Sequence, residues 1–304
     1  MEEPTAILFW KANLEYTLHV GRSHHAQRLA VTCTNYETAL TALEKADVSA
    51  FKLSPSKSPT PKTIFLFPGQ GSQHSFMGYG LFTAEPKFRE YFGQCCDILA
   101  PMIGVDLRTL LYPTNSPDEA ISDNSPAFQY AYYLQSAIFS LQYALAKTLM
   151  DWGIMPDALA GHSIGEYTAA CIAGILTLEN CLTLIVARGR GIERAPEGAM
   201  LSVHFTETEA IAFLQKMPEL TLAVMNSPND MFFSGPVEWI AEAETQLQHQ
   251  DIGCQRVHVN RAFHSPTLKA AAEDLTRVAQ GMKLPHTHIP HSHCVQLDWN
   301  LDVE

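Results

Sequence analysis

The chain has 304 residues, of which 46% are hydrophobic and 17% are charged, so it is long enough for one large globular domain or two ordinary ones. Its formal net charge of −12 argues against nucleic acid and anionic membranes as partners. No apolar run reaches the length of a membrane span, the first residues lack the basic start of a signal peptide, and seven cysteines without framework spacing indicate a reducing compartment. We therefore expect a globular protein of the cytoplasm.

The first sixty residues are expected to form a unit of their own. Apolar and polar residues alternate in two stretches and then take helical spacing, before a segment rich in serine, proline and lysine. These patterns predict strands over 14–22 and 28–33, a helix over 36–44 that Asn35 caps, and a linker over 54–62. The expected N-terminal domain thus covers residues 1–60.

A larger unit of strands and helices is expected over 61–197 and 260–304. It opens with an apolar strand, Ile-Phe-Leu-Phe at 64–67, and a tight glycine loop at 68–73. Apolar periodicity then predicts helices over 86–99, 136–152, 178–194 and 266–282. This succession is typical of an α/β fold.

Between those two segments the pattern changes. The expected strands cover 199–203, 222–226, 231–235 and 255–259, and the expected helices cover 207–215 and 237–249. The order is β-α-β-β-α-β, which is the ferredoxin-like order. We therefore expect residues 198–259 to form a small ferredoxin-like subdomain inserted into the larger unit.

The most informative motif is Gly-His-Ser-Ile-Gly-Glu at 161–166, which matches the Gly-x-Ser-x-Gly of a nucleophile elbow. An apolar stretch at 154–160 predicts a buried strand before it, and small apolar residues at 167–175 predict a packed helix after it. In that context Ser163 is exposed at the start of a helix, with backbone N–H groups directed at whatever it attacks. Ser163 is therefore the candidate nucleophile.

A serine nucleophile needs a base and an oxyanion hole. His264 is the candidate base, since an imidazole can take the serine proton near neutral pH and later return it. The N–H of Ile164 and the glycine loop around Gln70 are the candidate oxyanion donors. His162 is expected to point away from the nucleophile as a packing residue.

Arg188 is the candidate ligand for a substrate carboxylate. A guanidinium that faces Ser163 would hold such a group through two parallel hydrogen bonds. Arg190 and Arg194 lie on the same predicted helix and compete for this role. The three arginines are therefore alternatives at this point.

Four motifs in this order resemble one family. They are residues 67–73 (Phe-Pro-Gly-Gln-Gly-Ser-Gln), 161–166, 188–189 (Arg-Gly) and 262–265 (Ala-Phe-His-Ser). Together they resemble the acyltransferase domains of modular type I polyketide synthases, which are related to malonyl-CoA:acyl-carrier-protein transacylase. The likeness covers about residues 14–295, and its first part resembles the linker between ketosynthase and acyltransferase domains. It implies an α/β-hydrolase-like large subdomain with a parallel sheet, an inserted ferredoxin-like subdomain and an N-terminal α+β linker segment.

The resemblance also implies roles for single residues. Ser163 would be acylated from an acyl-CoA with His264 as the base, and Gln70 and the N–H of Ile164 would form the oxyanion hole. The acyl group would then pass to the phosphopantetheine thiol of an acyl carrier protein, with no metal and no other cofactor. The implied partners are malonyl-CoA, the carrier protein and a neighbouring ketosynthase domain.

The implied substrate-binding residues are Arg188, Gln135, Phe263 and Ile164. Arg188 would bind the free carboxylate of a malonyl-type extender, and Gln135 occupies the position of a pocket glutamine. Phe263 resembles the malonyl-selective form, in which a Phe fills the space that an α-methyl group would need, whereas the methylmalonyl form carries Ser there. Ile164, rather than Gln, after the nucleophile also resembles the malonyl form.

Two features depart from the family. Arg261 replaces the usual His, and we expect its cation to face solvent. Family members continue for several dozen residues past position 304 and use that region to orient the catalytic His. We therefore expect this chain to be a fragment of a longer synthase or a truncated relative.

Other functions stay open from the sequence. A serine hydrolase or thioesterase would use the same elbow but needs an acidic residue between nucleophile and His, where Asp230 and Asp251 lie. A truncated, non-catalytic module that docks a carrier protein is a third interpretation. Histidines at 286–294 have the density of a zinc site, although an exposed polar strand and loop is the favoured interpretation there.

Overall fold

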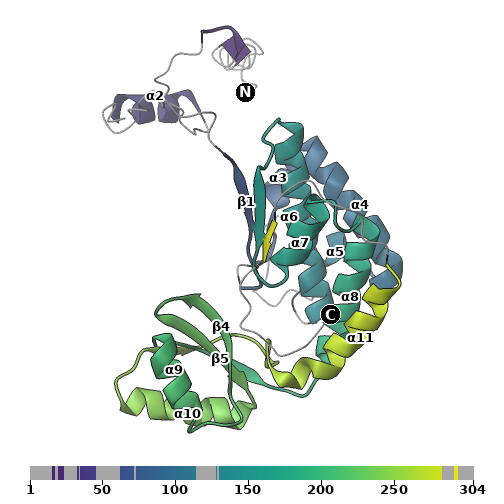
Figure 1. Ribbon diagram of the computed structural model, residues 1–304. Coiled ribbons are helices and arrows are strands. Elements are labelled where there is room, and N and C mark those ends of the chain that lie inside the picture. Colours follow the sequence, from purple (N-terminus) through teal and green to yellow (C-terminus); the bar gives the residue numbers. More distant parts are fainter. Residues whose placement is uncertain are drawn as a thin grey trace. The chain divides into compact units, whose positions relative to one another are not determined.

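The computed structural model describes residues 16–17, 20–23, 33, 35–45, 62–71, 73–113, 128 and 130–282, together with the backbone of 291–293. The chain divides into two compact units, Met1–Pro61 and Lys62–Glu304. Figure 1 labels many of the helices and strands of both.

In the first unit, helix α2 (Tyr36–Lys45) begins where the sequence predicts a helix. Asn35 caps it, because its Oδ1 accepts the N–H of Thr38 at 2.8 Å. The strand expected over 28–33 and the linker expected over 54–62 lie almost entirely outside the described residues.

The strand expected over 14–22 is wrong. Tyr16, Thr17 and Val20 are helical, and the N–H of Gly21 donates to the carbonyl of Thr17 at 3.0 Å. A turn of helix satisfies its backbone groups locally, whereas a strand needs a neighbouring strand to do so. Alternation of apolar residues over so short a stretch fits both structures.

Three parallel strands form the sheet of the second unit, in the order β1-β2-β7. They are β1 (Ile64–Phe67), β2 (Ala158–Gly161) and β7 (His291–His293). Phe65 and Phe67 are buried, whereas the alternate residues of β1 are more than half exposed, so one face of this strand packs against the core. The central strand β2 is shorter than the stretch expected over 154–160, because Pro156 lacks the N–H that a central strand needs.

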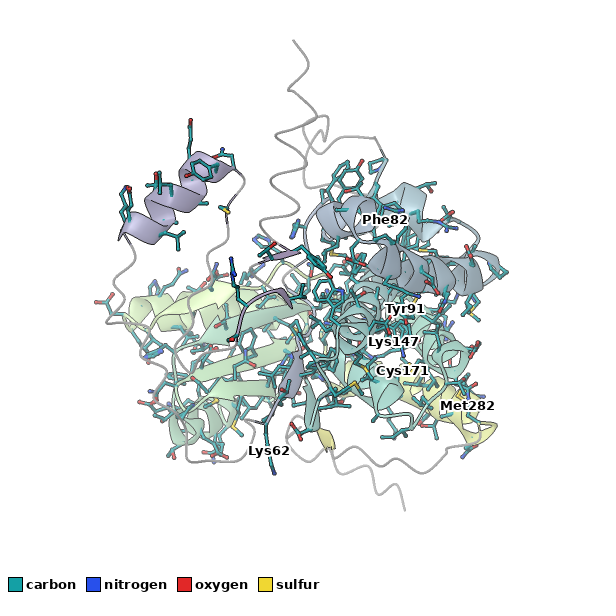
Figure 2. All side chains as sticks on the ribbon, turned by 90° about the horizontal axis from the view of Figure 1, so that it is seen from above. Lys62, Phe82, Tyr91, Lys147, Cys171 and Met282 are labelled. Atoms are coloured by element: carbon teal, nitrogen blue, oxygen red, sulfur yellow. The ribbon has the colours of Figure 1, made fainter. Side chains whose placement is uncertain are left out.

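Helices α6 (Ala131–Asp151) and α7 (Gly165–Ile172) cover the buried face of the parallel sheet (Figure 1). The other helices of this region are α3 (Tyr79–Ala84), α4 (Pro86–Ile103), α5 (Leu107–Leu111), α8 (Leu178–Arg194) and α11 (Lys269–Gln280), which follows the short 3-10 turn η3 (Pro266–Leu268). The largest hydrophobic core lies among α4, α6 and α8. Figure 2 shows Tyr91 and Lys147 side by side on this helical layer, with Nζ of Lys147 5.5 Å from the ring centroid. Within the described residues, the helices are too short or too polar to cross a membrane.

A four-stranded antiparallel sheet follows, in the order β4-β5-β3-β6. Its elements are β3 (Ala199–Val203), α9 (Glu207–Leu214), β4 (Thr221–Ser227), β5 (Asp230–Gly235), α10 (Val237–His249) and β6 (Cys254–Arg256). Both helices pack on one face, where the rings of Phe213 and Phe233 stack with centroids 5.7 Å apart. The element order and the strand order confirm the ferredoxin-like fold.

The chain passes twice between the parallel sheet region and the four-stranded sheet. The two connections run side by side, because the N–H of Gly198 donates to the carbonyl of Asn260 at 3.2 Å. A Cβ at position 198 would lie 2.7 Å from the Cβ of Ala262, so this close approach requires glycine.

Candidate active site

The turn between β2 and α7 presents Ser163 in a strained backbone conformation. Its φ of 52° lies in the left-handed region, which residues other than glycine rarely adopt. A Cβ at Gly161 would lie 2.4 Å from the nitrogen of Glu166, and a Cβ at Gly165 would lie 2.1 Å from the carbonyl oxygen of Phe67. Glycine is therefore needed on both sides of the serine, and the turn has the geometry of a nucleophile elbow.

His264 faces Ser163 from the loop that follows the four-stranded sheet. Its Nε2 lies 3.2 Å from Oγ of Ser163, and its own φ of 54° is also left-handed. The loop is held by Ser265, whose Oγ donates to the carbonyl of Ala262 at 2.7 Å. Folding thus brings the two sequence-predicted residues into hydrogen-bond contact.

The environment keeps His264 neutral at neutral pH. Burial, followed by the nearby cation of Arg188 and the ring of His162, lowers the pKa of its imidazole to about 4. A neutral imidazole has a nitrogen lone pair that can accept a proton. The ring is therefore ready to take the proton of the serine hydroxyl.

Arg188 reaches the same point from α8. Its Nη2 donates to Oγ of Ser163 at 3.4 Å, and its guanidinium lies 5.9 Å from the ring centroid of Tyr167. Nη1 is buried and has no hydrogen-bond partner among the described residues. Because a buried cationic donor without a partner is costly, this guanidinium is suited to an anionic ligand.

The other two arginines of α8 point elsewhere. Arg190 donates to the carbonyl of Met102, and Arg194 donates to the carboxylate of Asp274. Of the three candidates from the sequence, Arg188 is therefore the one beside the nucleophile.

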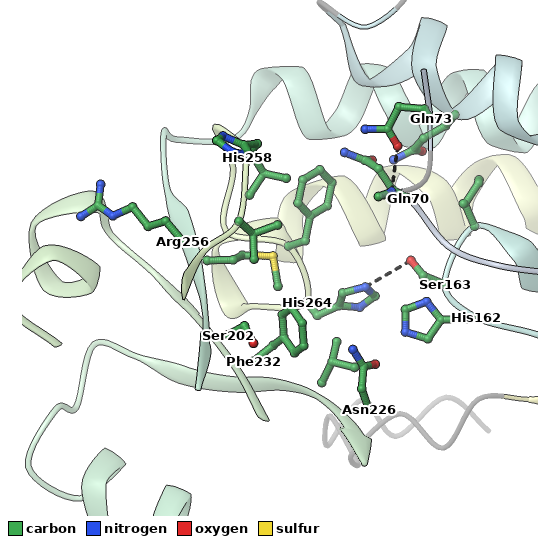
Figure 3. Close-up of a pocket in the computed structure, with 18 of the residues that line it drawn as sticks. Gln70, Gln73, His162, Ser163, Ser202, Asn226, Phe232, Arg256, His258 and His264 are labelled. Atoms are coloured by element: carbon green, nitrogen blue, oxygen red, sulfur yellow. Dashed lines mark hydrogen bonds between the residues drawn. The ribbon is translucent and has the colours of Figure 1, made fainter. Parts of the chain in front are cut away.

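The glycine loop after β1 packs against the elbow. A Cβ at position 69 would lie only 2.4 Å from Nδ1 of His162. The loop can approach the elbow this closely because glycine has no Cβ. Gln70 and Ile164 both line the cavity beside Ser163. The expectation that His162 points away is wrong: the tight turn leaves its ring on the cavity, near that of His264 (Figure 3).

These residues line a cavity of about 450 Å³. Its opposite wall is the face of the four-stranded sheet that turns away from α9 and α10, as Figure 3 shows for Ser202, Asn226 and Phe232. Met200, Val224 and Gln255 complete that wall. The sequence analysis did not predict these residues. The alternation along β3 was a signal, because Leu201 points into the core and its neighbours in the strand must therefore point to the opposite face.

The cavity is cationic. None of the described residues that line it is Asp or Glu, while Arg188 and Arg256 are present. Arg256 extends away from the cavity in Figure 3, and its Nε pairs with Glu244 at 2.9 Å, so Arg188 is the charge at the nucleophile. Asp230 and Asp251, the acids that a hydrolase triad could use, do not line the cavity.

Gln135 and Phe263 also line the cavity, as the resemblance implies. Gln135 is 1% exposed, and its Oε1 has no hydrogen-bond partner among the described residues. Within those residues there is no group of three His, Cys, Asp or Glu side chains that could hold a metal ion. The side chains of the histidines at 286–294 lie outside the described part of the chain.

The expectation that Arg261 faces solvent is wrong. Its side chain is only 13% exposed, and it donates to the carbonyls of Ile192 and Glu193 at the end of α8. The last four carbonyls of a helix lack the usual acceptor role within it, and this guanidinium donates to two of those in α8, of which that of Ile192 also accepts the N–H of Ala195 at 3.1 Å.

Comparisons with known proteins agree with the site. Residues 64–302 match the family model described as the acyl transferase domain. Mycoketide-CoA synthase of Mycobacterium tuberculosis is 35% identical over 224 residues, which are 73% of this chain and 5% of that protein. Polyketide synthase GfsA of Streptomyces halstedii is 31% identical over 280 residues, which are 89% of this chain and 4% of that protein. The chain therefore spans a small part of the length of these relatives.

Solved structures show the same likeness. The acyl transferase domain of SpnD, in complex with 2-(pent-4-yn-1-yl)malonyl, has a TM-score of 0.80 and 30% identity over 92% of this chain and 64% of that one. Malonyl CoA-acyl carrier protein transacylase from Burkholderia pseudomallei has a TM-score of 0.64 and 28% identity over 76% of each chain. These findings confirm the resemblance that the four sequence motifs carry.

Proposed function

Because this chain belongs to the acyl transferase domain family, we propose that it moves a malonyl unit from coenzyme A to the phosphopantetheine thiol of an acyl carrier protein. In this proposal residues 1–60 are part of a ketosynthase–acyltransferase linker, 61–197 and 260–304 form the acyltransferase subdomain, and 198–259 form the small subdomain. A neighbouring ketosynthase domain and a cytoplasmic location belong to the same proposal.

The first half-reaction acylates Ser163. His264 takes the proton of the serine hydroxyl as Oγ attacks the thioester carbonyl, and the 3.2 Å separation of Oγ and Nε2 supports that transfer. The oxyanion accepts hydrogen bonds at the N–H of Ile164 and at Gln70. When the carbon–sulfur bond breaks, His264 returns the proton to the sulfur of coenzyme A, which leaves as the thiol.

The second half-reaction reverses these steps with a different thiol. His264 takes the proton of the phosphopantetheine thiol, its sulfur attacks the acyl-serine carbonyl, and the ester bond to Ser163 breaks. The proton then returns to Oγ of Ser163. In this proposal His264 takes and returns a proton in each half-reaction, and no cofactor is needed.

The observation that carries this proposal is the pairing of the nucleophile with a buried cation. Nη1 of Arg188 lacks a partner among the described residues, and no carboxylate lines the described cavity. A malonyl carboxylate would neutralise this guanidinium and accept two hydrogen bonds from it. Gln135 lines the same cavity, and in this proposal its side-chain NH2 group donates a hydrogen bond to the substrate.

The choice of malonyl over methylmalonyl rests on two side chains. Phe263 and Ile164 both line the cavity beside the nucleophile. In this proposal Phe263 fills the space that an α-methyl group would need, as the family resemblance implies. One methyl group is worth about 1–3 kcal/mol of discrimination in such a pocket. Malonyl is therefore the favoured extender and methylmalonyl the disfavoured one.

The function is tested by following the acyl group to a thiol. The 304-residue chain is incubated with an equimolar mixture of malonyl-CoA and methylmalonyl-CoA, with pantetheine as the accepting thiol, and products are identified by mass. We expect malonyl-pantetheine in excess over methylmalonyl-pantetheine. Free malonate without any acyl-pantetheine would identify a hydrolase and contradict the proposal, and an excess of methylmalonyl-pantetheine would contradict the choice of extender.

A further inference from the structure

Arg261 links the loop of His264 to the end of helix α8. Its Nε donates to the carbonyl of Ile192 at 3.2 Å, and its Nη2 donates to the carbonyl of Glu193 at 3.1 Å. Nη1 donates to the carbonyl of Asn260 within its own loop at 2.9 Å. One planar guanidinium therefore joins two segments that are far apart in the sequence.

Glu193 extends the link to a third element. One carboxylate oxygen lies 3.6 Å from Nη2 of Arg261. The other accepts the N–H of Ala131, the first residue of α6, at 2.5 Å. That N–H has no acceptor within its own helix, and a carboxylate at a helix N-terminus is favourable. Both side chains are largely buried, with 13% of the arginine and 21% of the glutamate exposed.

Each of the three joined elements carries a residue of the active site. The loop carries His264 three residues after Arg261. Helix α8 carries Arg188 five residues before Glu193, and α6 carries Gln135 four residues after Ala131. A helical turn contains about 3.6 residues, so both helix positions lie little more than one turn from the link.

The chemistry of arginine suits this place better than that of other cations. A helix C-terminus attracts positive charge, and a guanidinium can donate to several carbonyls at fixed angles in one plane. A histidine, which the family resemblance implies as the usual residue here, has only two ring nitrogens and could not make the same three backbone contacts.

We propose that Arg261 is a positioning residue which, together with Glu193, fixes the base, the carboxylate-binding arginine and Gln135 in one arrangement around Ser163. The inference rests on the proposed roles of Ser163 and His264 as nucleophile and base. It does not depend on the identity of the acyl group.

The test measures the reactivity of Ser163 with a neutral reagent. An alkyl fluorophosphonate forms a bond between phosphorus and Oγ, fluoride leaves, and His264 takes the serine proton, so its rate reports the nucleophile and the base without any substrate carboxylate. The variants are Arg261→Ala, Arg261→Lys and Glu193→Gln. The matched control is Arg108→Ala, which removes another partly buried arginine, one that pairs with Asp97 and Asp106 instead.

We expect Arg261→Ala to label about tenfold more slowly than the wild type, because small misplacement of reacting groups has large effects on rate. Arg261→Lys and Glu193→Gln keep part of the link, so their labelling rates should lie between those of the wild type and Arg261→Ala. Added guanidinium ion, below the concentration that unfolds the protein, should speed labelling of Arg261→Ala and leave Arg108→Ala unchanged. Rescue of the labelling rate without a rise in thermal stability would separate positioning from a purely stabilising role.

Two results would overturn the inference. One is labelling of Arg261→Ala at the wild-type rate. The other is equal slowing in Arg108→Ala at a similar loss of thermal stability. If Arg261→Ala does not fold, Arg261→Lys decides, and labelling at the wild-type rate would then contradict the inference. A wild type that reacts with the fluorophosphonate but not with malonyl-CoA would refute the proposed function while leaving this test valid.

Discussion

Oγ of Ser163 lies 3.2 Å from Nε2 of His264, across 101 residues of sequence, and both residues have a left-handed backbone. A non-glycine residue in that region costs on the order of 1–3 kcal/mol. Such strain persists only where the surrounding structure imposes it, and it gathers at functional sites. Its presence at both residues, and at only Phe76 and Asp251 besides among the described non-glycine residues, supports the proposal that the pair works as a unit.

The pH dependence of acylation should report the environment of His264. A base works only when neutral, so the rate must fall as pH falls through the pKa of the imidazole. Because burial, the cation of Arg188 and the ring of His162 lower that pKa to about 4, we expect the rate of acylation by malonyl-CoA to stay high well below the ordinary midpoint of 6.5 and to fall near pH 4. Stopped reactions analysed by intact mass give this profile.

Two variants control the interpretation of that profile. Arg188→Gln removes a cation that disfavours protonation of His264, so the falling limb should move to higher pH. Asparagine tolerates a left-handed backbone, so His264→Asn should keep the loop in place. This variant should lose most of the activity, and its remaining rate should no longer fall near pH 4. If the wild-type rate instead falls near pH 6.5, the imidazole of His264 is exposed to water, which would contradict its buried position.

Arg188→Gln should also slow acylation by malonyl-CoA far more than acylation by a thioester with an uncharged acyl group. A hydrogen bond to a charged group contributes about 1.5–3 kcal/mol. Glutamine keeps one NH2 group that can replace one of the two donors, so we expect acylation by malonyl-CoA to slow by the loss of one such bond, about 10- to 150-fold. Acylation by acetyl-CoA, which has no carboxylate to bind, should change far less. Arg188→Lys, which keeps the charge but not the paired donors, should lie between. Equal losses with both thioesters would show that Arg188 does not bind the carboxylate.

Phe263→Ser should weaken the preference for malonyl. Making room for one methyl group is worth about 1–3 kcal/mol, or about 10- to 200-fold in the ratio of kcat/KM for methylmalonyl-CoA and malonyl-CoA. Phe232→Ser is the matched control, because Phe232 also lines the cavity but on the wall formed by the four-stranded sheet. Competition between the two thioesters measures the ratio. A larger change in the control than in Phe263→Ser would place the α-substituent against the other wall.

Gly165→Ala should destabilise the elbow. The added Cβ would lie 2.1 Å from the carbonyl oxygen of Phe67, and overpacking of this kind lowers the free energy of unfolding by about 1–3 kcal/mol. Gly80→Ala in α3 meets nothing within 4 Å and should raise it by about 0.4–1 kcal/mol, because alanine restricts the unfolded chain. Denaturant unfolding compares the two, and a stabilised Gly165→Ala would contradict the tight turn.

Local signals in the sequence were strong enough to predict several elements to the residue. Helix α8 has the predicted bounds because Thr177 caps its start, accepting the N–H of Asn180, and the chain leaves the helix just before Pro196. Strand β3 was predicted with its observed bounds too. The motif residues Ser163 and His264 were found because their types and spacing resemble one family closely.

What the sequence could not predict depends on contacts between distant segments. The partners of Arg261 lie 68 and 69 residues earlier, at a helix end that no local pattern connects to it. The cavity wall is formed by the face of a sheet whose orientation only the fold decides. The segment 14–22 was misassigned because its alternating residues fit a helical turn as well as a strand.

The central claim is that Ser163 becomes acylated, and intact-protein mass spectrometry after brief incubation with malonyl-CoA tests it most directly. We predict a single malonyl adduct on the wild type, located at Ser163 by peptide mapping, and none on Ser163→Ala. The adduct should disappear when pantetheine is added, with malonyl-pantetheine as the product. An adduct that persists in Ser163→Ala, or no adduct on the wild type with any acyl-CoA, would contradict the account.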